Sequence, residues 1–190
     1  MCAYVLIKPS KDYIKEIEDF KKEIFNSDSK YKYEGCAGLQ HFDDINEWIE
    51  KLEAYSSAET CPKDKVPSTL YLFVRDEDDK IVGMIDVRHH INHPVLSTIG
   101  GHIGYSVRPS ERGKGIGTEM LKAALEKCKE FGIDKALITC YKDNAASERV
   151  IINNGGVSTN SLTVNNVVID ESGINAGGQK ITNVAAGEAG

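Results

Sequence analysis

The feature that most constrains the fold is a glycine-rich stretch, residues 107–118 (VRPSERGKGIGT), which joins a predicted strand to a predicted helix. Glycine adopts backbone conformations that other residues avoid, so Gly113, Gly115 and Gly117 let a ligand approach the main chain closely. The first N–H groups of the following helix have no partner within it and lie at the positive end of its dipole. This turn is therefore predicted to be a preformed anion site.

The kind of anion is narrowed by what the motif lacks. The nucleotide P-loop pattern G-x-x-x-x-G-K-[ST] is absent, and the spacing G-x-G-x-G differs from the dinucleotide fingerprint G-x-G-x-x-G. Arg112 and Lys114 add positive charge beside the glycines. The residues alone leave open a different phosphate ligand or an ordinary strand-to-helix turn without one.

The chain up to about residue 156 alternates helical and strand patterns. Apolar residues three and four apart predict helices at 11–25, 43–55, 114–131 and 144–154. β-Branched and aromatic content predicts strands at 3–7, 69–75, 81–89, 101–107 and 136–141. One strand–helix–strand crossover, between residues 107 and 136, implies a parallel pair within a mostly antiparallel sheet. The predicted class is α/β, with a mixed sheet flanked by helices.

Composition excludes several classes of protein. The net charge is −6, and no long run of like charge is present, so we predict no nucleic-acid partner and no membrane-surface patch. No secretory signal and no apolar stretch of about 20 residues are present, so we expect a cytoplasmic protein. The five cysteines form no C-x-x-C pair and are expected to be free thiols. Cys128 and Cys140 fall in apolar patterns and are predicted to be buried.

Three segments together resemble the GNAT acetyltransferases. Residues 112–117 (RGKGIG) resemble the family's R/Q-x-x-G-x-G/A motif, which cradles the pyrophosphate of coenzyme A. Residues 101–109 (GHIGYSVRP) resemble its fourth strand, and Asn144-x-x-Ser147 resembles the start of its last helix. The resemblance implies that residues 1–156 are an N-acetyltransferase domain. Such a domain moves acetyl from acetyl-CoA to a primary amine of a small molecule or peptide.

The resemblance also implies where the cofactor binds. A backbone bulge near residues 105–107 is expected to hold the pantetheine and polarise the thioester carbonyl. The implied cofactor-binding residues are Tyr105, Ser106, Val107, Arg112, Gly113, Lys114, Gly115, Ile116, Gly117, Thr118, Asn144 and Ser147.

Two catalytic residues are implied less directly. His102 stands where family members often carry a glutamate, and an imidazole with an ordinary pKa near 6.5 can act as a base; the alternative is a structural histidine. The tyrosine that the family often uses as an acid falls at Ile151 and is therefore missing. Tyr141 is the substitute candidate, and an inactive acyl-CoA-binding module is the alternative function.

A histidine cluster begins at the end of the strand predicted at 81–89. The spacing His89-His90-x-x-His93 fits no common metal-site pattern, so we predict no metal. We expect instead a loop that lines the acceptor pocket. Asp86, Arg88, His89 and His90 are then the candidates for acceptor binding.

Residues 157–190 differ from the rest and contain no aromatic residue, proline, cysteine or histidine. Two strand-like runs, 162–170 and 179–184, flank a predicted turn at 171–178. Residues 164–187 resemble the head-to-neck repeats of trimeric autotransporter adhesins. Because a GNAT chain has a final β-hairpin here, we expect that hairpin to be replaced or altered. The tail is then either a surrogate hairpin or a trimerising structural piece, and homo-oligomerisation is one expected consequence.

Overall fold

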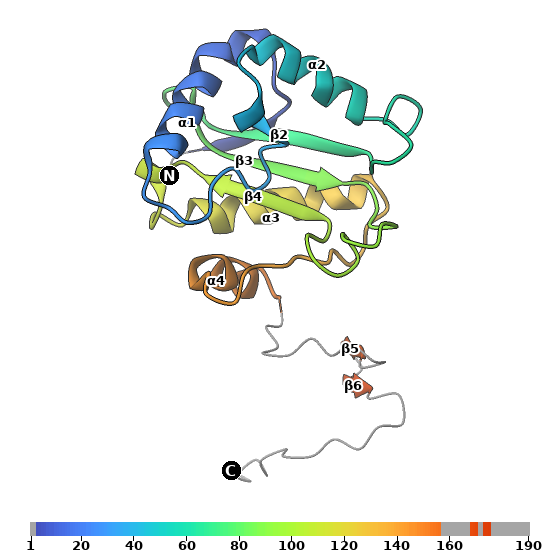
Figure 1. The fold of residues 1–190 in the computed structure, drawn as a ribbon. Helices are drawn as coiled ribbons and strands as arrows, with labels where there is room; N and C mark the ends of the chain where they lie inside the picture. Colours follow the sequence, from blue (N-terminus) through green and yellow to red (C-terminus); the bar gives the residue numbers. More distant parts are fainter. Residues whose placement is uncertain (1–2, 157–167, 171–172, 176–190) are drawn as a thin grey trace. The chain divides into compact units, whose positions relative to one another are not determined.

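The structure is a computed structural model that describes residues 3–156, 168–170 and 173–175. The chain divides into two units, Met1–Val157 and Ser158–Gly190. The first unit holds a four-stranded antiparallel sheet in the order β1–β2–β3–β4, with helices on both faces (Figure 1). The predicted α/β class, a mostly antiparallel sheet flanked by helices, is confirmed.

Eight of the nine predicted segments of the first unit contain a regular element, with ends shifted by three residues or fewer. The strands are β1 (Tyr4–Ile7), β2 (Ser68–Arg75), β3 (Lys80–Arg88) and β4 (Ile103–Val107). The helices are α1 (Ile14–Asn26), α2 (Ile45–Tyr55), α3 (Ile116–Glu130) and α4 (Ala145–Asn153). Short 3-10 turns lie at Lys11–Tyr13, Leu39–His41 and Pro109–Glu111. No helix within the described residues is long and apolar enough to span a membrane.

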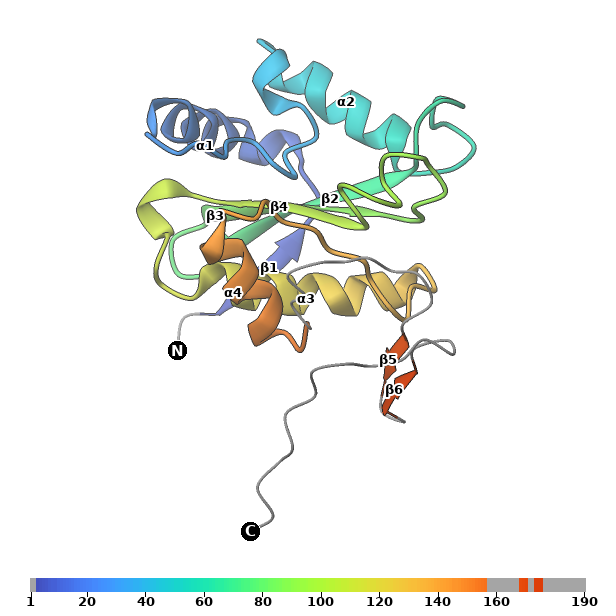
Figure 2. The same ribbon diagram turned by 60° about the horizontal axis from the view of Figure 1, so that its bottom comes forward.

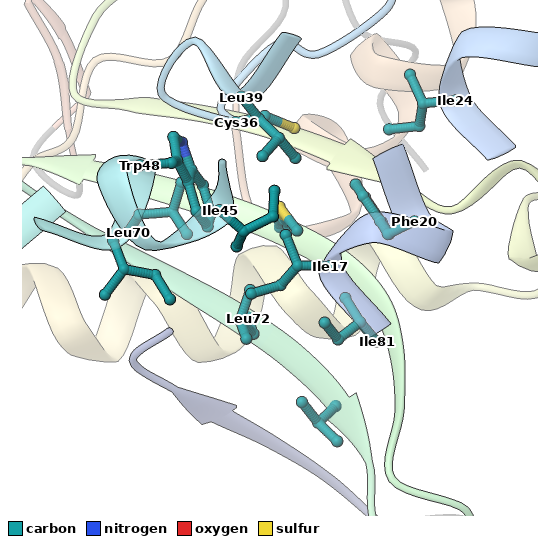
Figure 3. Close-up of a cluster of buried hydrophobic side chains, with 13 residues drawn as sticks. Ile17, Phe20, Ile24, Cys36, Leu39, Ile45, Trp48, Leu70, Leu72 and Ile81 are labelled. Carbon is teal, nitrogen blue, oxygen red and sulfur yellow. The ribbon is translucent and has the colours of Figure 1, made fainter. Parts of the chain in front are cut away.

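The sheet separates two hydrophobic cores. Helices α1 and α2 cover one face and α3 covers the other (Figure 2). Figure 3 shows the first core, where Ile17 and Phe20 of α1 and Trp48 of α2 pack over Leu72 of β2, all fully buried. The second core lies under α3, whose buried stripe includes Met120, Leu121, Ala124 and Cys128. The three-and-four spacing of these apolar residues is what fixes each helix on its face.

The fifth predicted strand, residues 136–141, is not formed. The His102 N–H donates to the Leu137 carbonyl at 2.7 Å, as a strand partner would. However, the Leu137 N–H donates to Nδ1 of His102 at 2.9 Å, and the Gly100 N–H donates to Oγ1 of Thr139 at 2.9 Å. Because side chains take the places of ladder partners, this segment touches the start of β4 without extending the sheet. The expected parallel pair is therefore absent from the described sheet.

Two smaller expectations are also wrong. Cys140 is exposed, because its segment is not a packed strand, whereas Cys128 is buried as predicted. The expected bulge near residues 105–107 is absent, since β3 and β4 pair in unbroken register from Gly83↔Val107 to Val87↔Ile103. The register shift in this sheet lies instead between Phe73 and Val74 of β2.

In the second unit, β5 (Val168–Asp170) pairs antiparallel with β6 (Gly173–Asn175). The strand β5 falls within the strand-like run at 162–170. The strand β6 falls within residues 171–178, which were predicted as a turn from their glycine and asparagine content. The β-branched Ile174 at its centre, opposite Ile169, favours the extended conformation instead. The run at 179–184 and the adhesin-like stretch outside these strands lie beyond the described residues.

Candidate active site

The glycine-rich turn is exposed at residues 112–115 and leads into the start of α3. Gly115 is the N-cap of α3 with φ +82°, and Gly113 has φ +76°. A Cβ atom at either position would meet no described protein atom within 4 Å. The Thr118 N–H already donates to the Gly115 carbonyl at 3.0 Å, so the N–H groups of Ile116 and Gly117 precede the first intrahelical bond. The open space at Gly113 and Gly115 directly precedes these two donors in the chain, an arrangement that suits an anion site.

Gly117, the third glycine of the motif, has a packing role. A Cβ atom on Gly117 would lie 3.1 Å from a methyl of Val150 on α4 and 3.5 Å from a methyl of Val107 on β4. Gly117 therefore allows α3 to pack closely against α4 and β4. Sequence alone suggested ligand approach at all three glycines, whereas the open space lies at Gly113 and Gly115.

A buried carboxylate organises the positive charge beside the turn. Glu111 is 3 % exposed, and Lys114 lies 3.0 Å from it, Arg75 3.2 Å and Lys80 3.3 Å. Although burial opposes ionisation, the hydrogen bonds from Lys114 and Lys80 lower the pKa of Glu111. Arg75 also pairs with Asp78 at 2.8 Å, so three cations face two carboxylates and one positive charge is left in excess beside the turn. Glu111 carried no distinguishing signal in the sequence, where it resembled an ordinary surface acid.

Arg108 anchors the other side of the turn to α1. Its Nε donates to Glu23 at 2.7 Å, and its Nη1 donates to Glu16 at 2.9 Å and to the Ile81 carbonyl at 2.9 Å. The Ser110 N–H also donates to Glu23 at 2.6 Å. Although burial opposes it, the hydrogen bonds from Arg108 and Ser110 lower the pKa of Glu23. This buried arginine fixes where β4 ends and the turn begins.

Among the described residues, no strand pairs with the edge of β4 that faces away from β3, and this edge leads directly into the turn. The Arg88 N–H donates to the His102 carbonyl and the Arg108 N–H donates to the Val82 carbonyl, which fixes the alternation of the ladder. The backbone groups of Ile103, Tyr105 and Val107 consequently face away from β3. We call these outward N–H and C=O groups the open edge of β4. They can bind an extended ligand along the strand.

The predicted residues of the last helix lie close to this edge. The Tyr105 hydroxyl lies 2.8 Å from Oγ of Ser147, and Asn144 Oδ1 accepts the Ser147 N–H at 3.1 Å as the N-cap of α4. The structure therefore brings Tyr105, Asn144 and Ser147 together. Arg112 reaches back from the turn, and its Nε donates to the Val107 carbonyl at 3.2 Å.

The loop between α1 and α2, residues 27–42, closes over β4 from the α1 side. Ser106 Oγ donates to the Glu34 carbonyl at 2.8 Å. Gly35 approaches so closely that a Cβ atom on it would lie 2.0 Å from the Gly104 carbonyl oxygen. Burial raises the pKa of Glu34. The loop thus lies backbone to backbone on the strand that carries the predicted cofactor residues.

Tyr141 takes part in a contact between this loop and the segment before α4. Its ring stacks on Tyr31 with centroids 4.9 Å apart and planes 16° apart. The Tyr31 hydroxyl and the Lys30 ammonium both bond to Asp143. Tyr141 is 59 % exposed, so its hydroxyl is accessible from solvent.

His102 lies at the start of the open edge and is 9 % exposed. Its Nδ1 accepts the Leu137 N–H, which places the proton of the neutral ring on Nε2. Burial lowers the pKa of His102. In this arrangement neither ring nitrogen offers a free lone pair, so action as a base would require the Leu137 contact to open.

This geometry predicts a pH dependence of stability. A histidine whose folded pKa is lowered stabilises the protein fully above its unfolded pKa of about 6.5, and that stabilisation falls as the pH drops toward the folded pKa. We expect the chain to lose stability between pH 7 and pH 5. His102→Asn keeps an acceptor for the Leu137 N–H but cannot titrate, so its urea midpoint should fall less over the same range. An identical slope in parent and variant would contradict the proposed role of His102 in this loss.

The predicted acceptor residues are divided between the two faces of the sheet. Asp86 and Arg88 face the α2 side, where Nη1 of Arg88 donates to the carbonyls of Gly100 and Gly101 at 3.2 and 3.0 Å. His89 bonds Thr69 through Nε2 at 2.9 Å and stacks on Phe131 of the α3 side, with centroids 4.0 Å apart. Burial lowers the pKa of His89. His89 thus lies away from Asp86 and Arg88.

His90 and His93 line a cavity of about 500 Å³ beside the loop that follows α2. Within the described part of the chain, no group of three or more histidine, cysteine, aspartate or glutamate side chains is placed to hold a metal ion.

Comparisons with known proteins agree with this architecture. Residues 10–157 match the Acetyltransferase (GNAT) domain family. No curated protein sequence matches the chain. One similar solved structure is a candidate ribosomal-protein-serine acetyltransferase from Vibrio cholerae, with 18 % identity, a TM-score of 0.50 and coverage of 80 % of this chain and 78 % of that one.

A second similar structure is the microcin C7 self-immunity acetyltransferase MccE in complex with acetyl-CoA and AMP. It is 20 % identical, with a TM-score of 0.52, and the match covers 80 % of this chain and 77 % of that one. At these identities the structural likeness supports the fold. The family match spans most of the chain, and it shows that this protein belongs to the GNAT acetyltransferases, acyltransferases that use acetyl-CoA as donor.

Proposed function

We propose that this chain transfers acetyl from acetyl-CoA to a primary amine by direct attack. The observation that carries the proposal is the continuity of two features: an exposed turn at Gly113–Gly115 that leads into α3, and the open edge of β4 that precedes this turn. The pyrophosphate would bind the N–H groups of Ile116 and Gly117. The pantetheine would lie along Tyr105 and Val107. The acetyl-CoA present in the related MccE structure supports this donor.

The proposed chemistry needs few side chains. A neutral amine attacks the thioester carbon, an outward N–H of β4 stabilises the developing oxyanion, and coenzyme A leaves as a thiolate. An ordinary thiol has a pKa near 8.5, so this leaving group needs little protonation. We propose His102 as base, directly or through water, once its Nδ1 is released from Leu137. We propose Tyr141 as the acid.

Two measurements on one preparation test this function. Calorimetry measures acetyl-CoA binding, and a thiol-release assay against a panel of primary amines measures turnover. We expect binding in the micromolar range and amine-dependent thiol release. Binding without release from any amine would favour an inactive acyl-CoA-binding module. Absence of both would overturn the proposal.

The tail allows a separate prediction. We propose that residues 157–190 complete or assemble the acetyltransferase domain by covering the unpaired segment at 136–141, which leaves the open edge of β4 to the pantetheine. Unpaired edges promote association. Truncation after Gly156 should therefore lower the melting temperature or change the oligomeric state measured by light scattering. A truncated chain that stays monomeric and melts no lower than the parent would contradict both roles.

A further inference from the structure

A pocket that the proposed chemistry does not use lies between α2, the end of β3 and the loops at 58–67 and 90–100. Its volume is about 330 Å³. Leu52, Val66, Val95 and Leu96 contribute apolar walls, and Asp86 contributes a carboxylate. Apolar walls around a few polar groups are typical of a site for a small organic ligand.

Asp86 lines this pocket, and one of its two carboxylate oxygens has no hydrogen-bond partner among the described residues. It is 5 % exposed, and its Oδ1 has no hydrogen bond to any described residue. Its Oδ2 lies 3.8 Å from Nε of Arg88, which is too far for a strong hydrogen bond. A buried polar atom without a partner is costly, so such an atom at a pocket wall indicates a missing hydrogen-bond donor.

Lys51 supplies the complementary group. Its Nζ donates to the Ala37 carbonyl at 2.7 Å and lies over the rings of Tyr55 and Phe42, 5.2 and 5.3 Å from their centroids. An ammonium carries three donors, so further donors remain for a ligand oxygen. Burial lowers the pKa of Lys51, and the charge of Asp86 opposes that shift.

The charges in the pocket exclude some ligands. Burial raises the pKa of Asp86, whereas the charges of Arg88 and Lys51 and a hydrogen bond with Ser68 favour its ionised form. Because two cations already lie near this carboxylate, a third cation would meet net repulsion. The matching group is uncharged, with an N–H or O–H for Asp86 and an oxygen for Lys51. A peptide amide offers both within one planar unit. We propose that this pocket binds the acceptor, and that Asp86 and Lys51 recognise a backbone amide of a peptide-type amine.

This inference rests on the proposed function for the position of the reacting amine. Asp86 pairs in register with Gly104, so the pocket lies one strand, roughly 4.8 Å, from β4, whose open edge would hold the thioester. Successive peptide residues advance about 3.5 Å, so the amide at Asp86 is the first or second after the reacting α-amine. Gly35 and Nη2 of Arg88 lie over Gly104, and an acceptor that spans both sites would displace the loop around Gly35.

Matched acceptors test the proposal. A short peptide amide is compared with two analogues in which the first or second backbone amide N–H is replaced by an ester oxygen. Calorimetry with the full chain should show that one of the two esters binds about 10- to 100-fold more weakly, because it leaves Asp86 without its donor. Asp86→Ala should bind peptide and ester equally. Asp86→Asn keeps an acceptor oxygen and should keep part of the difference.

Asp64 provides the matched control, because it lines the same pocket but forms an exposed ion pair with Lys65 at 3.1 Å. Asp64→Ala should preserve the difference between peptide and ester. Equal binding of all three acceptors by the parent would overturn the inference, as would tighter, Asp86-dependent binding of a hydroxylated amine than of the peptide. Thiol release with simple amines is measured separately, so a failure of acetyl transfer is distinguished from a failure of amide recognition.

Discussion

Gly115→Val should weaken acetyl-CoA binding by about 100-fold and lower the melting temperature by only a few degrees. Gly115 has φ +82°, and a Cβ atom there would meet no described protein atom within 4 Å. A left-handed conformation costs a residue with a Cβ roughly 1–2 kcal/mol. The added methyl groups occupy the space where phosphate would contact the N–H groups of Ile116 and Gly117. Loss of one or two charge-assisted hydrogen bonds, about 3 kcal/mol together, corresponds to this change in affinity.

Gly132 is the matched control at the opposite end of α3. Its φ is +72°, and a Cβ atom there would also meet no described atom within 4 Å. Gly132→Val should therefore lose a similar amount of stability and bind acetyl-CoA like the parent. Calorimetry and thermal melting on both variants separate backbone strain from lost ligand contact. Unchanged affinity of Gly115→Val, or an equal loss of affinity in Gly132→Val, would place the pyrophosphate elsewhere.

Arg108→Met should produce the largest loss of stability among single substitutions in this region, about 3 kcal/mol. Breaking a buried ion pair from one side typically costs roughly 3–5 kcal/mol. The side chains of Glu16 and Glu23 are 32 % and 29 % exposed, so water offsets part of that cost. The Ile81 carbonyl also loses its donor. Urea unfolding should show a lower midpoint with an unchanged dependence on denaturant concentration.

Lys129→Met is the control, because it removes an exposed ion pair instead of a buried one. The side chains of Lys129 and Glu126 are 64 % and 69 % exposed. Exposed pairs contribute little, so this control should change stability by roughly 0.5 kcal/mol or less. The lowered pKa of Glu23 adds a pH signature: its stabilisation is complete above about pH 4.5 and disappears as the pH falls through the folded pKa. Arg108→Met should show less of this acid-side loss. Equal stability of the two variants would mean that Arg108 does not anchor the turn.

Local patterns predicted the helices and four strands because each element buries one regularly spaced stripe. The strand predicted at 136–141 does not form, because strand pairing depends on the partner segment as well as on β-branched content. The Leu137 N–H donates to an imidazole nitrogen of His102 instead of to the carbonyl of a neighbouring strand, and no residue spacing in the sequence predicts this contact. The ion pairs between Arg108 and α1 could not be predicted from the sequence either, because Glu16 and Glu23 lie more than 80 residues earlier in the chain.

By contrast, the sequence could have predicted that the candidate acceptor residues lie on opposite faces of the sheet. Successive residues of a strand point to opposite faces, so Asp86 and Arg88 share one face and His89 faces the other. The prediction placed them in one acceptor pocket because they are close together in the chain. The binding turn was predictable, because three glycines at a strand-to-helix junction permit few other arrangements. Which of those glycines faces open space depends on Val150 of α4, and the motif does not contain that information.

Acetyl-CoA binding at the turn and along β4 can be tested by titrating isotope-labelled protein and following its amide NMR spectrum. We expect the amide resonances of Gly115, Ile116 and Gly117, together with those of Tyr105 and Val107, to shift in one saturable transition, while the resonance of Gly132 stays in place. Saturable shifts confined to other parts of the chain, or none at any of these five amides, would contradict this binding mode.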